Sequence, residues 1–195
     1  MMYPYQIYCL GNMLFSKMWT HLSYERIVNY QNVERVYDIK KSMISSLYDL
    51  TYDCTEITSR IYLGNAYNAR DFYNLESKNI GLILNCTEEI PNYFEDFFEY
   101  KKINIDDVNE ANITPYLDEY ADLMNNYIKN SDKNILVHCF MGSSRSATII
   151  LAYLIKYKKY SPEKSLEYIK KLREVVNPNI SFFNQLKEKF ETNNS

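Results

Sequence analysis

Several features that mark particular classes of protein are scarce in this chain of 195 residues. No apolar run approaches the roughly 18 residues that a membrane-spanning helix needs, and the longest candidate covers only residues 147–155. The first 15 residues are apolar but lack the basic segment and the cleavage site of a secretory signal peptide. We therefore expect an intracellular protein without a membrane segment. The expected compartment is the cytoplasm or the nucleus, or the host cytoplasm if the source is a virus.

Metal ligands are also scarce. The chain has 2 histidines, His21 and His138, and no cysteine pair at the spacing of a zinc site. We therefore expect neither a metal nor another cofactor. Because no export signal precedes them, the 4 cysteines are interpreted as reduced thiols. They are Cys9, Cys54, Cys86 and Cys139.

No strong excess of charge is present. The 22 basic and 25 acidic side chains leave a net charge of -3, which argues against nucleic acid or an anionic membrane as a partner. No internal repeat or low-complexity linker divides the chain. We expect an N-terminal extension over residues 1–52, with patchy helical periodicity and no readable role, followed by a catalytic domain over residues 53–192.

Strands and helices alternate after residue 53. Expected strands lie within residues 56–64, 80–87, 101–106 and 134–139. Expected helices cover residues 65–76, 114–130, 145–157, 161–173 and 181–191, with Asn65, Thr114 and Ser161 as N-terminal caps. Acids Asp118 and Glu119 follow in the first turns of the second helix. This alternation predicts an α/β fold with a mainly parallel central sheet flanked by helices.

The stretch "VHCFMGSSRSA", residues 137–147, connects an expected strand to an expected helix. Ligands of α/β sheets bind at the carboxyl ends of strands, where free amides of the next helix attract anions. Gly142 allows a tight turn, and Arg145 adds a planar cationic fork that matches phosphate. The same field favours a nucleophilic thiolate at Cys139. Several backbone amides of the loop are therefore expected to converge on the anion.

Two neighbours of this loop have expected supporting roles. Ser146 is placed to donate a hydrogen bond to the sulfur of Cys139 as a leaving group. His138 is expected to orient the loop by hydrogen bonds rather than to act as a base. The alternative is a buried cysteine in an ordinary strand-helix turn. The pattern His-Cys-x-x-Gly-x-x-Arg, however, arises by chance only about once in a million windows.

A thiolate that attacks phosphorus also requires an acid to protonate the leaving group. Asp106 and Asp107 end the strand expected over residues 101–106, which should finish on the same edge of the sheet as the cysteine loop. The residues alone do not choose between the two acids. Both could instead be ordinary solvated loop residues.

The chain resembles the cysteine-based dual-specificity protein phosphatases over about 140 residues, roughly 53–191. The segment "VHCFMGSSRSATIILAYLI", with its HCxxGxxRS signature, is similar to the phosphate loop and following helix of that family. The segments "RIYLGNAYNA" and "LILNCTEEIPNYFE" resemble its opening strand and its Asn-containing strand. The segment "SPEKSLEYIKKLREVVNPNISFFNQL" resembles its two closing helices. The resemblance implies a protein-tyrosine-phosphatase-like fold.

The resemblance also implies roles for single residues. Cys139 would form a phosphocysteine, and Ser146 would help the thiolate to leave. Phosphate would be bound by the Arg145 side chain and by the amides of Phe140, Met141, Gly142, Ser143, Ser144 and Arg145. Asp107 has the spacing of the family's general acid, which Asp106 fits less well. Asn85 matches an asparagine that supports the phosphate loop from beneath, with a plain strand-end cap as the alternative.

The implied activity is the hydrolysis of phosphotyrosine and of phosphoserine or phosphothreonine in a phosphoprotein substrate. Phosphoinositide phosphatases carry lysines in the loop, and RNA 5'-triphosphatases carry threonine after the arginine together with a basic surface. This chain has neither feature, so both alternatives are disfavoured. A phosphate-binding pseudophosphatase is disfavoured too, because the cysteine, the arginine and the acid are all present.

Cys86 stands where the family commonly has valine, and it could form a disulfide with Cys139 on oxidation. A homodimer through the N-terminal region stays open.

Overall fold

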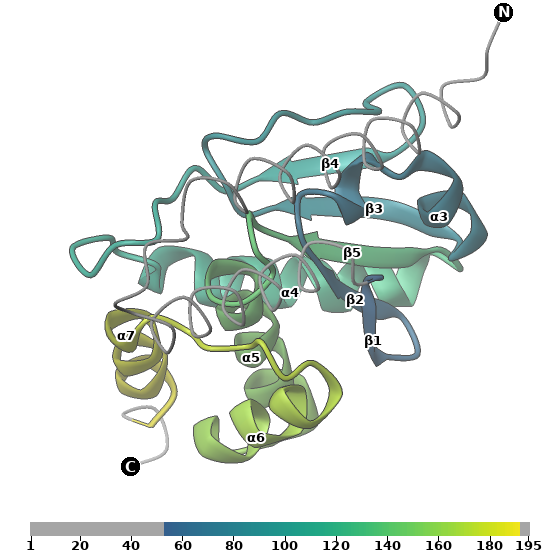
Figure 1. Ribbon diagram of the computed structural model, residues 1–195. Coiled ribbons are helices and arrows are strands. Elements are labelled where there is room, and N and C mark those ends of the chain that lie inside the picture. Colours follow the sequence, from purple (N-terminus) through teal and green to yellow (C-terminus); the bar gives the residue numbers. More distant parts are fainter. Residues whose placement is uncertain (1–52, 192–195) are drawn as a thin grey trace, which may run out of the picture. The chain divides into compact units, whose positions relative to one another are not determined.

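A computed structural model of the protein describes residues 53–191 (Figure 1). The expected N-terminal extension, residues 1–52, lies outside the described residues. The strands are β1 (Thr55–Thr58), β2 (Ile61–Gly64), β3 (Ile80–Asn85), β4 (Glu99–Lys102) and β5 (Asn134–His138). The helices are the short 3₁₀ turn η1 (Asn68–Arg70), α3 (Phe72–Ser77), α4 (Thr114–Asn130), α5 (Arg145–Lys158), α6 (Pro162–Leu172) and α7 (Ile180–Glu191). None of these helices is long and apolar enough to cross a membrane.

The strands form one sheet in the order β1-β2-β5-β3-β4, and only the β1–β2 pair is antiparallel. The predicted α/β fold with a mainly parallel sheet is therefore confirmed. Gly64 and Asn85 both pair with His138, and Lys102 pairs with Asn85. The four parallel strands thus end side by side at one edge of the sheet.

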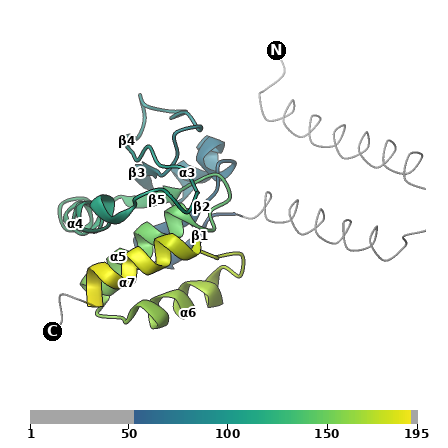
Figure 2. The ribbon, with the colours of Figure 1, turned by 90° about the vertical axis from the view of Figure 1, so that its left-hand side faces the viewer.

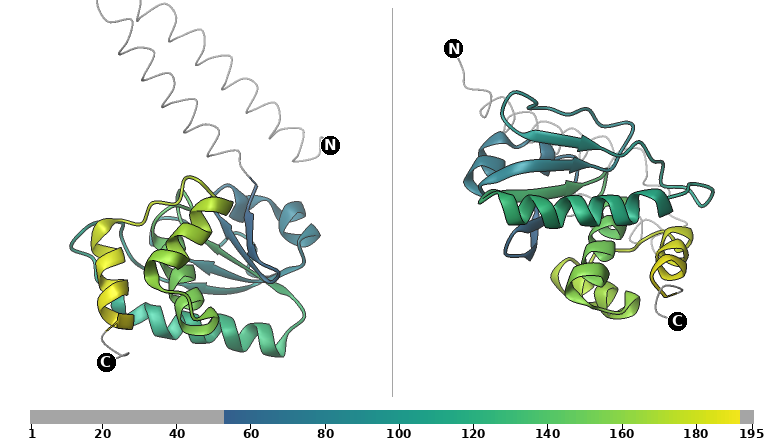
Figure 3. Two further views of the ribbon diagram at one scale, coloured as in Figure 1. Left: turned by 90° about the horizontal axis from the view of Figure 1, so that it is seen from below. Right: turned by 180° about the vertical axis from the view of Figure 1, so that it is seen from behind.

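The sheet is covered on both faces. Figure 2 shows α5, α6 and α7 on one side of the strands and α3 on the other, and Figure 3 shows α4 running along the sheet on the α5 side. Alternate residues of the buried strand β3 serve the two cores, because successive side chains of a strand point to opposite faces. Leu84 belongs to the larger core under α4 and α5, and Ile83 belongs to the smaller core under α3. Burial on both faces explains the unbroken apolar run of this strand.

The prediction of a single helix over residues 65–76 is wrong, because the structure has the 3₁₀ turn η1 and the separate helix α3 there. Asn65 Oδ1 accepts from the amides of Tyr67 and Asn68, but Tyr67 is the N-cap residue of the 3₁₀ turn η1 that follows, so Asn65 does not cap a helix as predicted. The chain leaves helical geometry at Asp71, with φ -92° and ψ 85°. The Asp71 side chain then accepts from the amide of Asn74 and starts α3 as a separate helix. Competition from a short polar side chain for a backbone amide divides the predicted helix.

One further boundary and one helix cap differ from the expectation. β4 spans Glu99–Lys102 instead of residues 101–106, because its partner β3 ends at Asn85 opposite Lys102. The helix α4 begins at Thr114, and the Thr114 hydroxyl does not cap it. The acceptor comes instead from α7, where Gln185 Oε1 accepts from the amides of Ile113 and Thr114.

The remaining caps and helix bounds follow the expectation closely. Ser161 caps α6 as predicted, accepting from the amide of Lys164 at 3.2 Å. The helices α5 and α7 each lie within one residue of their predicted bounds.

Candidate active site

The loop that follows β5 is held with its carbonyl groups turned away from its centre. Four consecutive carbonyl oxygens accept hydrogen bonds from segments outside the loop. They are Phe140 O from Ala66 N–H (3.1 Å), Met141 O and Gly142 O from the guanidinium of Arg173 (3.4 and 3.2 Å), and Ser143 O from Asn177 N–H (2.9 Å). With the carbonyl groups engaged on the outside, the amides of the loop are left to face an anion inside it.

Gly142 is required by its backbone. Its φ is +71°, in the left-handed region that glycine adopts without strain. A Cβ at this position would lie 2.5 Å from the carbonyl oxygen of Gly64, at the end of the neighbouring strand. The glycine singled out in the sequence therefore allows the loop to pass close to β2.

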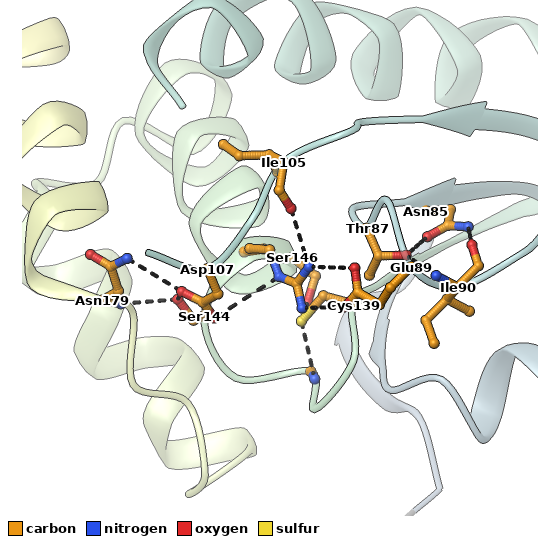
Figure 4. A network of polar contacts seen from close by, with 12 residues as sticks. Asn85, Thr87, Glu89, Ile90, Ile105, Asp107, Cys139, Ser144, Ser146 and Asn179 are labelled. Carbon is orange, nitrogen blue, oxygen red and sulfur yellow. Dashed lines mark hydrogen bonds and ion pairs between the residues drawn. The ribbon is translucent and has the colours of Figure 1, made fainter. Parts of the chain in front are cut away.

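Cys139 occupies the bottom of the loop and is only 1% exposed. Its Sγ accepts from the Gly142 amide and from the Ser146 hydroxyl, each at 3.2 Å (Figure 4). The expected contact between Ser146 and the sulfur is thus present. Two donors directed at one sulfur stabilise a thiolate.

Arg145, the first residue of α5, is buried and paired with Glu89. Arg145 Nη2 donates to Glu89 Oε1 at 2.8 Å, and Nη1 donates to Glu89 Oε2 and to the carbonyl of Ile105, both at 3.1 Å (Figure 4). Nε is buried and has no hydrogen-bond partner among the described residues. Burial acts to lower the pKa of Arg145, but the hydrogen bonds and charge of Glu89 outweigh it, so the pKa is raised.

Asp107 reaches the loop from the segment after β4. Its Oδ1 accepts from Ser144 Oγ at 2.8 Å and from Asn179 Nδ2 at 3.3 Å, and its Oδ2 lies 4.0 Å from Arg145 Nε. The backbone amide of Asn179 also donates a hydrogen bond to Ser144 Oγ at 3.0 Å, so Asp107, Ser144 and Asn179 are all hydrogen-bonded to one another. In the described part of the chain, the exposed side chain of Asp106 makes no such contact with the loop. The geometry therefore favours Asp107 over Asp106 as the acid nearest the site.

The two supporting residues expected from the sequence are His138 and Asn85. Neither ring nitrogen of His138 has a hydrogen-bond partner within residues 53–191, although both are buried. Burial is the main cause that lowers the pKa of His138 to about 4, so the enclosed ring is neutral near pH 7. A backbone hydrogen bond with Cys139 acts against this lowering of the pKa, and the role of His138 in orienting the loop stays a prediction.

The side chain of Asn85 bonds the segment that follows β3. Its Nδ2 donates to Ile90 O at 2.8 Å and to Asn92 Oδ1 at 3.0 Å, and its Oδ1 accepts from Thr87 Oγ1 at 2.7 Å. This segment carries Glu89. Asn85 is therefore connected to Arg145 and its loop through the segment of Glu89, and the support from beneath that the resemblance implies stays a prediction.

Cys86 follows Asn85 and is also buried. Its amide donates to His138 O at 2.8 Å, which places it beside Cys139 on the neighbouring strand. Burial is the main cause that raises the pKa of Cys86 well above its usual value, and both cysteines are free thiols. The disulfide between them stays a prediction.

Some residues of this site were missed in the sequence. Glu89 and Arg173 had no distinguishing signal, since each stands among other charged residues. Asn179 belongs to the segment that resembles the two closing helices of the family, which was the available clue. Among the described residues, no cluster of three or more histidine, cysteine or acidic side chains is suited to hold a metal ion.

Comparisons with known proteins agree with this geometry. The family described as "Dual specificity phosphatase, catalytic domain" matches residues 61–192. Dual specificity protein phosphatase 1-A of Xenopus laevis is 38% identical over 131 residues, which are 67% of this chain and 35% of that protein. Dual specificity protein phosphatase 4 of Gallus gallus is 39% identical over the same shares of the two chains. The chain thus spans about a third of the length of these curated relatives.

Solved structures support the same assignment. The crystal structure of DUSP15 is 32% identical, with a TM-score of 0.66, and the match covers 70% of this chain and 86% of that one. Human DUSP28, at 22% identity and a TM-score of 0.70, shares the fold. Both the residues of the loop and the overall architecture therefore lead to one conclusion: the chain belongs to the dual specificity phosphatase family.

Proposed function

We propose that the protein hydrolyses phosphate monoesters of phosphoproteins, on tyrosine and on serine or threonine, through a phosphocysteine at Cys139. One observation carries the proposal. The Cys139 sulfur accepts two hydrogen bonds at the bottom of a loop whose carbonyl groups are engaged on the outside. Such a loop combines a nucleophile with a set of amides for the phosphate oxygens.

The first step forms the covalent intermediate. The Cys139 sulfur attacks phosphorus, and the bond from phosphorus to the ester oxygen breaks. Loop amides and the guanidinium of Arg145 stabilise the charge on the other phosphate oxygens. Asp107, in its protonated form, gives its proton to the leaving oxygen.

The second step returns the free enzyme. Water attacks phosphorus, Asp107 takes a proton from that water, and the bond from sulfur to phosphorus breaks. Ser146 donates to the departing sulfur from 3.2 Å, which stabilises the thiolate that forms. Inorganic phosphate is released.

The substrate class follows from the loop and its surroundings. The side chains within the loop are neutral, so nothing there matches the additional phosphates of an inositide. They are Phe140, Met141, Ser143 and Ser144. Within residues 53–191 the sequence shows no insertion between the strands that would build a deep slot restricted to phosphotyrosine. This supports a site that also accepts the shorter phosphoserine and phosphothreonine.

The same proposal covers partners and location. The chemistry requires no metal, cofactor, nucleic acid or membrane, and a free thiol nucleophile suits the reducing cytoplasm or nucleus. Residues 53–192 form the catalytic domain in this proposal. A homodimer through residues 1–52 stays a hypothesis.

The proposal is tested by measuring turnover of an aryl phosphate and of phosphotyrosyl and phosphothreonyl peptides. We expect Cys139→Ser to lose nearly all activity. Asp107→Ala should lose about 10²–10⁴-fold on the peptides, whose leaving groups need a proton. Asp106→Ala is the matched control and should stay close to wild type.

Three outcomes would contradict the proposal or part of it. Full activity in Cys139→Ser would exclude the mechanism. A larger loss in Asp106→Ala than in Asp107→Ala would reassign the acid. Turnover confined to an inositol phosphate or an RNA 5'-phosphate, or phosphate binding without turnover, would replace the proposed substrate class.

A further inference from the structure

We propose that Glu89 is a positioning residue that holds the guanidinium of Arg145 with one edge turned toward the substrate phosphate. The inference rests on the proposed function, because it assigns the phosphate to the loop beside Arg145. Glu89 is itself 43% exposed, whereas Arg145 is 7% exposed in its side chain. The pair therefore joins a rim residue to a buried one.

The contacts of Arg145 divide its donors into two sets. Glu89 engages the end of the guanidinium, with one carboxylate oxygen on each Nη atom, and the carbonyl of Ile105 takes a further hydrogen of Nη1. This leaves Nε and the second hydrogen of Nη2, which form the side edge of the guanidinium. Nε is buried, has no hydrogen-bond partner within the described residues and forms only a long ion pair, at 4.0 Å, with Asp107 Oδ2. The free edge thus lies on the side of the candidate acid.

The position of Glu89 is itself well determined. Thr87 Oγ1 donates to Asn85 Oδ1 at 2.7 Å and accepts from the amide of Ile90 at 3.1 Å. The carbonyl of Ile90 accepts from Asn85 Nδ2 at 2.8 Å and from Lys102 Nζ at 2.9 Å. The segment on both sides of Glu89 is therefore tied to the ends of β3 and β4.

Replacing Glu89 should change phosphate binding in two opposite ways, one through its charge and one through the orientation of Arg145. Its carboxylate repels the phosphate, so removing that charge should by Coulomb's law favour phosphate binding. Loss of the bidentate contact instead frees the guanidinium to turn, which should weaken binding. Weaker phosphate binding after the loss of Glu89 therefore indicates a positioning residue. Tighter binding indicates a residue that merely competes with phosphate for Arg145.

The experiment measures the dissociation constant of inorganic phosphate by calorimetry, together with kcat and KM on an aryl phosphate. The full-length wild type is compared with Glu89→Gln and with Glu88→Gln, which removes the neighbouring charge. We expect Glu89→Gln to bind phosphate about tenfold more weakly and to raise KM, because a bidentate ionic contact becomes a single neutral one. Glu88→Gln should bind phosphate as tightly as wild type or more tightly.

Unchanged or tighter phosphate binding in Glu89→Gln would overturn the inference. If the wild type meanwhile binds phosphate and turns over substrate, the proposed function survives that result. A wild type that neither binds phosphate nor turns over would overturn both.

A second variant tests the route through the segment. Thr87→Val removes the hydroxyl that connects Asn85 to Ile90 and keeps the side-chain volume. We expect it to weaken phosphate binding in the wild type and to have little additional effect in Glu89→Gln, because both changes act through one contact. Full additivity of the two changes would show that Glu89 is not positioned by this segment, and would contradict the inference.

Discussion

His138 adjoins the nucleophile, and yet its ring is enclosed without a hydrogen-bond partner in the described structure. Burial is the main cause that holds its pKa at about 4, compared with 6.5 for an exposed histidine, and the nearby charge of Arg145 acts in the same direction. The folded state therefore keeps this side chain neutral over a range of pH in which the unfolded chain binds a proton. Residue 138 thus links protonation to stability.

We predict that the free energy of unfolding falls as the pH is lowered from 6.5 to about 4. Above pH 6.5 neither state protonates His138, and below about 4 both do, so the loss is confined to this window. The contribution of this residue is about 3 kcal/mol at most, from the difference between the two pKa values. Urea unfolding at a series of pH values measures it.

His138→Gln should flatten the pH dependence within that window, whatever its effect on absolute stability. His21→Gln is the control for removing a histidine as such. If the His138→Gln variant keeps the slope of the wild type, another group is responsible.

At the scale of residues, the sequence predicted the contacts that are local and missed those that are distant. Cys139, Gly142 and Ser146 lie within eight positions, so their spacing and chemistry are visible in one motif. Glu89 is 56 positions from Arg145 and stands in an acidic run that is typical of a solvent-exposed loop. Only the register of β3 against β5 brings the two together.

At the scale of elements, α7 supports the start of α4. Gln185 Oε1 accepts from the amides of Ile113 and Thr114, at 2.8 and 3.3 Å, and from the Thr114 hydroxyl at 3.1 Å. Its Nε2 donates to Ala111 O at 2.9 Å. One side chain therefore ties α7 to the segment that leads from Asp107 into α4.

We predict that Gln185→Ala lowers the free energy of unfolding by about 1–2 kcal/mol, as loss of a helix cap does, since the Ile113 amide loses its acceptor while the Thr114 amide keeps only Asn112 Oδ1. Gln185→Glu should lose less, because its carboxylate still accepts from these amides near the positive end of α4. Chemical denaturation of the two variants and the wild type measures the difference. Equal losses in both variants would show that capping is not what Gln185 contributes.

The expected elements failed where a distant side chain or a strand partner sets the boundary. The acceptor for the Ile113 amide comes from Gln185, about 70 positions away, and no local pattern shows it. The Thr114 amide also has a local acceptor, Asn112 Oδ1, at 3.1 Å. The end of β4 depends on where β3 stops, and not on its own apolar residues. Ser161, by contrast, caps α6 from the adjacent position, and the sequence predicted it correctly.

At the scale of the whole molecule, the parallel sheet assembles the site from segments far apart in the chain. The strands β2, β5, β3 and β4 end at one edge, and each is followed by a segment that contacts the phosphate loop or Arg145. The order of the strands could not be predicted from the sequence, because the residues of a short buried strand do not show which strands lie next to it. The position of the site at the carboxyl edge was predictable, since it follows from parallel strands alone.

The central claim is that phosphate passes through a covalent bond to Cys139, and Ser146→Ala offers the most direct measurement. Without the hydroxyl that supports the departing sulfur, hydrolysis of the intermediate should slow by about 10–100-fold, as expected for a hydrogen bond to a charged group. Mass spectrometry of the acid-quenched variant during turnover of a phosphotyrosyl peptide should find a phosphoryl group on Cys139. A Cys139 that stays unmodified while the same sample releases phosphate would contradict the account.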